Sequence, residues 1–308
     1  MIRKTQAVTL CLLILAAAAQ SSGQSTDRFD IAITVDDLTA HGALPQGMTR
    51  AGIAKSYLET LKAHGVPQAW GFVNAVHIKE DPPSERVLDL WRQAGFPLGN
   101  HTYSHMNLAS AASLEAWEAD AEAGEPTLKN HMQGQDWHYL RFPNLSAGSG
   151  DRAQQAMAWL KTKGYREADV SASFDDWAYT DTYARCVAKG DAESIATMKA
   201  QYLKGVDMGI VNLKAVSQKV YGRVIPQVLL THIGGFSAVM LPEVMQRLDA
   251  AGAHYVTLEK AQADPAYAET GGGVLMSRTA RSKGISLADI PMPPSASAVG
   301  EQLGKLCR

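Results

Sequence analysis

Amphipathic helices and short apolar strands alternate along the chain, with a glycine between each helix and the strand after it. Residues 51–64 place apolar side chains at helical spacing, Gly65 follows, and the apolar run 68–73 comes next. Glycine ends a helix at such a position because it adopts the left-handed conformation without steric cost. The same pattern recurs over residues 84–99, 151–174 and 242–258. Helices alternating with strands at this spacing predict βα units and a mainly parallel sheet.

Polar side chains follow the predicted strands at the point where each strand ends. These strands lie at residues 31–35, 96–100, 138–140, 170–174 and 228–231. In a (β/α) barrel, catalytic groups gather at the C-terminal ends of the strands, whereas an open doubly wound sheet gathers them at one switch point. Several strand ends that feed one site favour the barrel, and no glycine-rich phosphate loop follows the first strand. The predicted fold is therefore α/β, a distorted (β/α) barrel of about seven strands.

Two segments depart from this alternation. Residues 178–225 have the pattern of helices without an intervening strand, at 181–188, 192–203 and 206–221. We interpret them as a helical insertion near the rim of the barrel. Residues 271–308 carry three successive glycines and several prolines with little periodicity, which indicates an extended C-terminal tail. The barrel itself is assigned to residues 25–270.

The first two dozen residues have the composition of a secretory signal peptide. Arg3 and Lys4 precede an apolar run over residues 7–19, and small and polar residues follow it. The run is too short to span a bilayer. We expect residues 1–24 to be removed on export to the periplasm or the outside of the cell, which leaves no stable membrane span. An uncleaved anchor is the alternative.

Composition and charge exclude some partners and predict one covalent link. The formal net charge of −2 over 308 residues argues against a nucleic-acid-binding surface. After removal of the signal, Cys186 and Cys307 remain, and an exported protein meets an oxidising compartment. We predict a disulfide that holds the tail to the middle of the chain, with two unrelated buried thiols as the alternative. The sequence leaves the oligomeric state open.

Two adjacent aspartates end the first predicted strand. Residues 31–35 form an uncharged run, and Asp36 and Asp37 follow it. Neighbouring strand residues point in different directions, so one carboxylate can bind a metal while the other acts as a base. His101 and His105 stand at i and i+4, the spacing at which histidines on one face of a helical turn share a metal. With Asp37 they would form a site of two histidines and one carboxylate.

Five short motifs, in order, resemble those of the NodB-homology polysaccharide deacetylases, carbohydrate esterase family 4, over roughly residues 30–260. The motifs are Thr34-Val35-Asp36-Asp37, His101-Thr102-Tyr103-Ser104-His105, Arg141-Phe142-Pro143, Asp176-Trp177 and Leu230-Thr231-His232. The family usually has an aromatic residue before the Asp pair and glycine after it, and often another aspartate ahead of Asp-Trp. This chain has Val35, Leu38 and Ser173 there. These departures retain the ligands and proton carriers and bear on the shape of the groove.

The resemblance implies a barrel that binds one divalent metal ion and hydrolyses the N-acetyl group of a hexosamine-containing glycan. The metal is usually zinc, with cobalt or another transition metal as alternatives. Asp37, His101 and His105 are implied as its ligands, with Asp36 as the base and His232 as the acid. Three protein ligands leave a metal an open position for water. An imidazole titrates in the right range to protonate a leaving amine.

Further residues are expected to assist these groups. Asp176 would hold the far ring nitrogen of His232, and Arg141 would pair with Asp36. A backbone N–H near Asn144 would help to stabilise the oxyanion. The residues expected to line the substrate groove are Phe142, Pro143, Asn144, Trp177 and Leu230. Those assigned to surface or core are His41, His64, His77, His131, His138 and His254, with His77 the most favoured of them to line the groove.

Three other functions would use similar residues. An acetyl esterase on a decorated polysaccharide would apply the same chemistry to an ester. A carbohydrate-binding protein without turnover would keep only the groove. A non-haem iron oxygenase also binds its metal through two histidines and one carboxylate, but its usual sheet-sandwich context is not predicted. If the helical insertion lies across the rim, the groove is narrowed, and short or terminal sugars should be preferred over the middle of a polymer.

Overall fold

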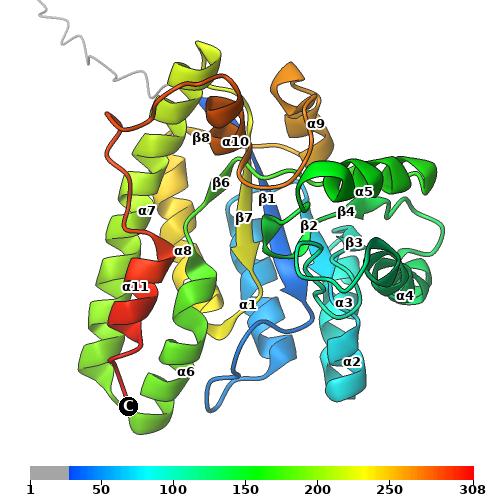
Figure 1. Ribbon diagram of the computed structural model, residues 1–308. Coiled ribbons are helices and arrows are strands. Elements are labelled where there is room, and N and C mark those ends of the chain that lie inside the picture. Colours follow the sequence, from blue (N-terminus) through cyan, green and yellow to red (C-terminus); the bar gives the residue numbers. More distant parts are fainter. Residues whose placement is uncertain (1–27) are drawn as a thin grey trace, which may run out of the picture.

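The computed structural model describes residues 28–308, so the predicted signal peptide at residues 1–24 lies outside the described part (Figure 1). One sheet of eight parallel strands forms the centre of the molecule. The strands are β1 (Phe29–Leu38), β2 (Ala69–Val73), β3 (Leu98–Asn100), β4 (Tyr139–Leu140), β5 (Arg166–Glu167), β6 (Ala172–Ser173), β7 (Gln227–His232) and β8 (Ala253–Tyr255).

The sheet curls into a half-barrel with β1 near its middle. The strand order is β5-β4-β3-β2-β1-β7-β6, and β8 pairs with the first residues of β1. Within residues 28–308 no strand pairing joins β5 to β6, so the barrel is open on that side. This arrangement confirms the predicted distorted (β/α) barrel of about seven strands.

The two faces of the sheet bury different side chains because neighbouring strand residues point in opposite directions. On β1, Ile31, Ile33 and Val35 belong to the large core between the sheet and the helices, whereas Ala32 belongs to a smaller cluster. The smaller cluster includes Trp70, Phe72, Tyr139 and Val228 from neighbouring strands. Apolar residues on both faces are the composition expected of a parallel strand that is covered on both sides.

Helices flank the sheet, and two of them belong to the C-terminal tail (Figure 1). The α-helices are α1 (Arg50–Ala63), α2 (Val76–Glu80), α3 (Arg86–Gln93), α4 (Leu114–Met132), α5 (Gly150–Thr162), α6 (Thr180–Lys189), α7 (Ala192–Tyr221), α8 (Gly235–Ala250), α9 (Leu258–Gln262), α10 (Leu275–Ser282) and α11 (Ala296–Leu303). The 3-10 helices are η1 (Pro82–Glu85), η2 (Pro143–Leu145), η3 (Asp176–Tyr179) and η4 (Pro265–Tyr267). Of the helices in residues 28–308, none combines the length and apolarity that a membrane span requires.

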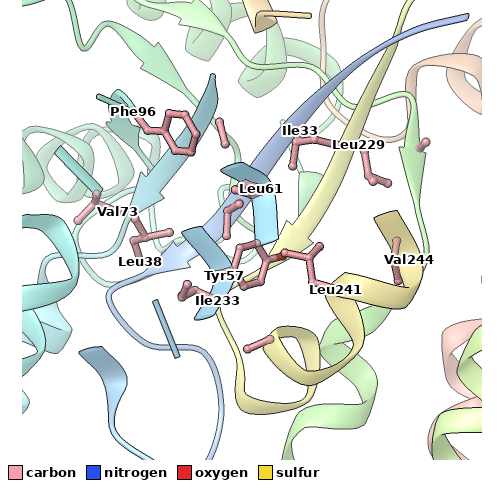
Figure 2. Close-up of a cluster of buried hydrophobic side chains, with 14 of the residues drawn as sticks. Ile33, Leu38, Tyr57, Leu61, Val73, Phe96, Leu229, Ile233, Leu241 and Val244 are labelled. Atoms are coloured by element: carbon pink, nitrogen blue, oxygen red, sulfur yellow. The ribbon is translucent and has the colours of Figure 1, made fainter. Parts of the chain in front are cut away.

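The main core lies between the sheet and the helices α1 and α8 (Figure 2). Figure 2 shows Tyr57 and Leu61 of α1 near Ile33 and Leu229 of the sheet, with Leu241 of α8 beside them. The Tyr57 hydroxyl donates to Thr231 Oγ1 at 2.6 Å, so the one polar atom of this ring is satisfied inside the core. A buried hydroxyl without such a partner would cost about 1–3 kcal/mol.

The predicted insertion is formed by α6 and α7, which lie beside the barrel and pack against α8. Helix α7 is a single helix, although the sequence analysis left residues 204–205 as a break between two. Gly205 carries the weak helix propensity that suggests such a break, at a cost of about 1 kcal/mol. Buried residues along the helix, among them Tyr202, Val206 and Ile210, provide packing that offsets this cost.

Several other element boundaries differ from the prediction. The strand expected over residues 170–174 is shortened to β6, and β5 precedes it. The segment between these two strands contains the buried Asp169, which ion-pairs with Arg278. Helix α4 was not predicted, and α8 begins at Gly235, seven residues before the predicted start, with Pro242 inside it. The tail contains α10 and α11 and is therefore not simply extended.

The predicted disulfide is present between Cys186 in α6 and Cys307 after α11. It closes a loop over a sequence separation of 121 residues. Closing a long loop restricts the unfolded chain, so we expect the double variant Cys186→Ala/Cys307→Ala to lose about 2–4 kcal/mol of unfolding free energy. Denaturant unfolding of the variant, and of wild type with and without reductant, measures this. Equal stability after thiol titration has verified reduction would contradict it.

Candidate active site

The predicted polar residues meet in one pocket at the C-terminal ends of the strands. Parallel strands end at the same edge of a sheet, so residues that are distant in sequence are brought together there. The pocket has a volume of about 270 Å³. It is lined by Asp36, Asp37, His41, His101, His105, Asn144, Leu145, Ser173, Asp175, Trp177, Leu230, His232 and Val274.

Asp36 and Asp37 both line this pocket although adjacent residues of a regular strand face opposite sides. The pairing of β1 with β2 shifts register between Val35 and Leu38, and Asp37 has a left-handed φ of 63°. Such a local irregularity re-aims a side chain. The two carboxylates therefore share one pocket and still have different partners, since Asp36 pairs with Arg141 and Asp37 with His41.

Asp37, His101 and His105 form a group that could hold a metal ion. Asp37 Oδ1 lies 3.4 Å from His101 Nε2 and 3.5 Å from His105 Nε2. One ligand atom from each residue lies within 4.8 Å of the others. Asp37 Oδ1 is buried and has no hydrogen-bond partner among the described residues. A bound cation would satisfy this oxygen, so the three side chains fit a divalent metal with N and O ligands.

Asp37 is held in its charged form. Burial disfavours ionisation, but the nearby His101 and the hydrogen bond from His41 outweigh it, so the pKa of Asp37 lies well below its usual value. Burial, followed by the charge of His101, lowers the pKa of His105 and favours the neutral imidazole that a metal requires. This combination of an ionised carboxylate and a neutral imidazole suits metal ligation.

The two histidines do not lie on a helical turn, contrary to the sequence analysis. Residues 101–107 form a loop in which Thr102 and His105 have left-handed φ values of 59°. The Asn74 side chain holds this loop by donating to the carbonyl oxygens of His101 and Thr102 at 2.6 and 3.0 Å. The spacing of four residues brings the rings together through this loop conformation rather than through helix periodicity.

His101 is oriented by a backbone group. Its Nδ1 lies 2.7 Å from the carbonyl oxygen of Arg141, which can only accept, so Nδ1 carries the proton. In the neutral ring, Nε2 is then unprotonated and faces Asp37. Metal-binding histidines are commonly fixed in this way by a hydrogen bond from the other ring nitrogen. Arg141 therefore contributes to the site through its main chain as well as its side chain.

Arg141 pairs with Asp36, as predicted. The guanidinium Nη1 donates to Asp36 Oδ1 and Oδ2 at 3.1 and 3.3 Å, while Nη2 donates to Thr34 Oγ1 at 3.0 Å. Nε donates to the Ala168 carbonyl at 2.6 Å. Arg141 is 1% exposed, so the pair is almost fully removed from solvent. Buried charges of this kind require hydrogen-bond partners, and each of the three guanidinium nitrogens has at least one here.

His232 and Asp176 form a second charged pair on the other side of β1. His232 Nδ1 donates to Asp176 Oδ1 at 2.9 Å, and the His232 main-chain N–H donates to Oδ2 at 2.8 Å. The Ser237 hydroxyl donates to Oδ2 at 2.7 Å. Burial opposes the imidazolium, but the charge and hydrogen bond of Asp176 prevail and raise the pKa of His232 to about 9. The same contacts outweigh burial and lower the pKa of Asp176.

His41 is a site residue that the sequence analysis assigned to surface or core. Its Nδ1 donates to Asp37 Oδ2 at 2.7 Å, and its Nε2 lies 3.4 Å from the Trp177 carbonyl oxygen. Its ring centroid is 4.9 Å from that of His232. A histidine four residues after the Asp pair was the available signal, but spacing did not show that the chain turns back to the carboxylate. His77, the histidine favoured for the groove, instead contacts Glu80.

The predicted walls of the groove are partly confirmed. Asn144, Trp177 and Leu230 line the pocket, and Trp177 is 45% exposed. Phe142 and Pro143 do not, because both are buried and the Phe142 ring stacks on Trp117 in the core at 5.4 Å. Ser173, which the sequence analysis connected with the shape of the groove, also lines the pocket, and the lining residues missed from the sequence are Leu145, Asp175 and Val274. Val274 comes from the tail, and no local pattern indicated its approach.

The structure is therefore a parallel half-barrel with a carboxylate–imidazole cluster at its strand ends. The sequence model of the family described as "Polysaccharide deacetylase" matches residues 23–168 of this chain. The matched part of the chain is similar to this family, the NodB-homology domain. The matched residues contain Asp36, the three candidate ligands and Arg141, whereas Asp176 and His232 lie beyond them. The fold brings both into the same site.

Solved structures to which this chain is similar include family 4 carbohydrate esterase proteins. A CE4 family pseudoenzyme from Bacillus anthracis is 15% identical, with a TM-score of 0.51, over 77% of this chain and 66% of its own. A mutant of that pseudoenzyme with restored enzymatic activity is 16% identical, with a TM-score of 0.50, over 77% and 68%. The peptidoglycan deacetylase PdaC from Bacillus subtilis is 19% identical, with a TM-score of 0.49, over 84% and 96%. None of the curated proteins that were compared matches the chain.

Proposed function

We propose that this chain is a metal-dependent deacetylase that hydrolyses the N-acetyl group of a hexosamine-containing glycan. The observation that carries the proposal is the placement of two proton carriers around the candidate metal ligands. Asp36 and His232 are register partners on the neighbouring strands β1 and β7. Asp36 is held by the guanidinium of Arg141, and His232 by the carboxylate of Asp176. Amide hydrolysis requires a base and an acid, and the cationic partner of Asp36 and the anionic partner of His232 favour these two roles.

Asp37, His101 and His105 would hold the cation, and zinc is the metal that best suits one carboxylate and two imidazoles. When bound, such a cation supplies a Lewis acid for the acetamide carbonyl and lowers the pKa of a water molecule. Three ligands from the chain leave room for both. Cobalt or another transition metal would serve the same ligand set.

The residues of the chain would divide the proton transfers between them. Asp36 accepts the proton of the attacking water, because its carboxylate faces the pocket and Arg141 keeps it in place. His232 then donates a proton to the leaving amine nitrogen through Nε2, the ring nitrogen that Asp176 leaves free. Without this proton the amine cannot depart, and the tetrahedral species returns to the amide. A main-chain N–H near Asn144 is proposed to assist the oxyanion.

We further propose that the chain acts after export, in the periplasm or outside the cell. The disulfide between Cys186 and Cys307 supports an oxidising compartment. An acetyl esterase is the second candidate, because the same groups attack esters more readily than amides. A silent carbohydrate-binding protein is the third, and the complete set of ligands and proton carriers argues against it.

Acetate release from a panel of glycans tests the proposal. The mature protein is treated with chelator, single metals are added back, and acetate is measured with chitin oligomers and with acetylated xylan. We expect release from the N-acetylated oligomers, loss with chelator and recovery with zinc. Release from xylan alone would establish the esterase instead. If the metal-loaded protein released acetate from none of the glycans, the carbohydrate-binding protein without turnover would be the remaining candidate.

His41 is expected to orient the metal ligand Asp37, because it occupies the oxygen that faces away from His101 and His105. We predict that His41→Phe weakens zinc affinity by about 10–100-fold, the usual effect of losing such a contact. Competition with a chromophoric chelator measures this affinity independently of turnover. His77→Phe serves as the matched control, because His77 contacts Glu80 outside the pocket. Equal zinc affinity in both variants would exclude the orienting role.

A further inference from the structure

A second cavity, of about 710 Å³, lies between α7 and the C-terminal tail. Figure 1 shows α11 of the tail alongside α7 on the flank of the half-barrel. The residues contributed by α7 include Gly205 and Met208, and those from the tail include Met292 and Val299. Most of the cavity is thus built from the helical insertion and the tail, and residues 173–175 complete it. None of these segments lies within the residues matched by the family model.

This cavity adjoins the candidate active site. Ser173 and Asp175 line both the catalytic pocket and the second cavity. They are joined to each other, because the Asp175 main-chain N–H donates to Ser173 Oγ at 3.2 Å. One molecule that occupied the catalytic pocket could therefore extend past these two residues into the second cavity.

The side chains of the second cavity are mainly apolar. The apolar and aromatic members are Phe174, Tyr179, Tyr202, Met208, Met292, Pro293, Pro294 and Val299. Asp175 and Lys204 are its charged members. The side-chain amides of Gln201 and Gln302 are hydrogen-bonded to each other, with Gln201 Nε2 donating to Gln302 Oε1 at 2.7 Å. Such a wall favours an apolar group over a polyanion or a sugar, which would need several free polar partners.

The place of the cavity indicates which part of the substrate it receives. It adjoins β6, which pairs with β7, the strand that carries His232. His232 is the proposed donor to the amine, so the sugar lies on this side and the departing acetyl group lies towards Asp37 and the histidines. A group bound beyond Ser173 and Asp175 would therefore be attached to the sugar, not to the acetyl carbon.

We propose that this cavity binds an apolar aglycone, so that the substrate is an N-acetylhexosaminide linked to an alkyl or lipid-like group. This inference rests on the proposed deacetylase function and specifies its substrate class. It also gives a physical reason for a preference for short glycosides over the interior of a long polymer. The insertion lies beside the pocket and provides a place for one end of a small amphiphile.

Two glycosides that differ only in the aglycone test this inference. Octyl and methyl N-acetyl-β-glucosaminide are compared with the metal-loaded protein below the micelle concentration of the octyl compound. Acetate release gives KM, and calorimetry gives Kd without turnover. Burial of the longer chain is expected to lower both constants for the octyl compound by at least about tenfold. Equal constants for the two compounds would overturn the inference.

Gly205 offers a variant that fills the cavity with little strain. Gly205 lies within α7, and a Cβ added there would meet no atom within 4 Å. Gly205→Phe should abolish the octyl advantage and leave the methyl compound unaffected. Gly205→Ala is the matched control, because it also replaces the glycine of the helix while leaving most of the cavity open. If Gly205→Phe still bound the octyl compound more tightly than the methyl compound, the octyl chain would not lie in this cavity.

The outcomes separate the aglycone inference from the function on which it rests. Acetate release at equal rates from both glycosides keeps the deacetylase and rejects the aglycone site. Tighter octyl binding that Gly205→Phe abolishes, without acetate release from any compound, supports the cavity and rejects the deacetylase. Diacetylchitobiose is included as a third compound. If it gains affinity as much as the octyl compound and loses it in Gly205→Phe, the occupant is a second sugar and the apolar assignment is wrong.

Discussion

Replacing Asp36 by asparagine is expected to lower kcat for acetate release by on the order of 10²–10⁴-fold while the protein retains its metal. Asparagine has nearly the same size and can still accept a hydrogen bond from Arg141, but it cannot accept a proton from water. The proposed ligands Asp37, His101 and His105 are unchanged. Steady-state acetate release together with metal analysis of the purified variant measures both parts of this expectation.

The stability of the same variant has to be measured, because it leaves the charge of Arg141 without a carboxylate partner. Arg141 is 1% exposed, and an uncompensated buried charge can cost about 3–5 kcal/mol of unfolding free energy. Asp249→Asn is a suitable control, since Asp249 pairs with His64 away from the pocket. If Asp36→Asn loses the metal, the separation of base from ligand is wrong. If it keeps both fold and full rate, Asp36 is not the base.

The second large effect is expected at His232. His232→Gln should reduce kcat/KM by about 10²–10⁴-fold, because glutamine cannot protonate the leaving amine. In wild type the acid must be protonated, so activity falls as pH rises through the pKa of His232, which Asp176 raises. Asp176→Asn removes this negative charge and should move the alkaline limb of the pH profile to lower pH by about 1–3 units.

The pH profile distinguishes a proton donor from a residue that only holds the structure. A structural role for His232 would lower the rate of His232→Gln at every pH without removing the alkaline limb. Ser237→Ala provides a milder control, because it deletes one donor to Asp176 Oδ2 and leaves the charge in place. An alkaline limb that stays at the same pH in Asp176→Asn would assign it to another group.

Much of the site could be predicted because its chemistry is local in the sequence. Asp36 and Asp37 lie near the end of β1, His101 follows β3, Arg141 follows β4, and His232 ends β7. Parallel strands bring such positions to one edge whatever the lengths of the connecting helices. The same reasoning failed for Phe142 and Pro143, because the motif that contains them shows their order but not which face of the chain they occupy. His105 was wrongly expected on a helix, because a spacing of four residues from His101 does not distinguish a helical turn from a loop.

The sequence by itself determined the alternating βα order, and it predicted the candidate proton carriers, the candidate metal ligands and the pairing of Cys186 with Cys307. These follow from residue type and from positions at strand ends. Only the tertiary structure decided that His41 holds Asp37, that both aspartates share a pocket, and that α7 and the tail enclose a second cavity beside it. Each of these depends on contacts between distant segments or on a backbone irregularity, and neither hydrophobic periodicity nor motif spacing records such features.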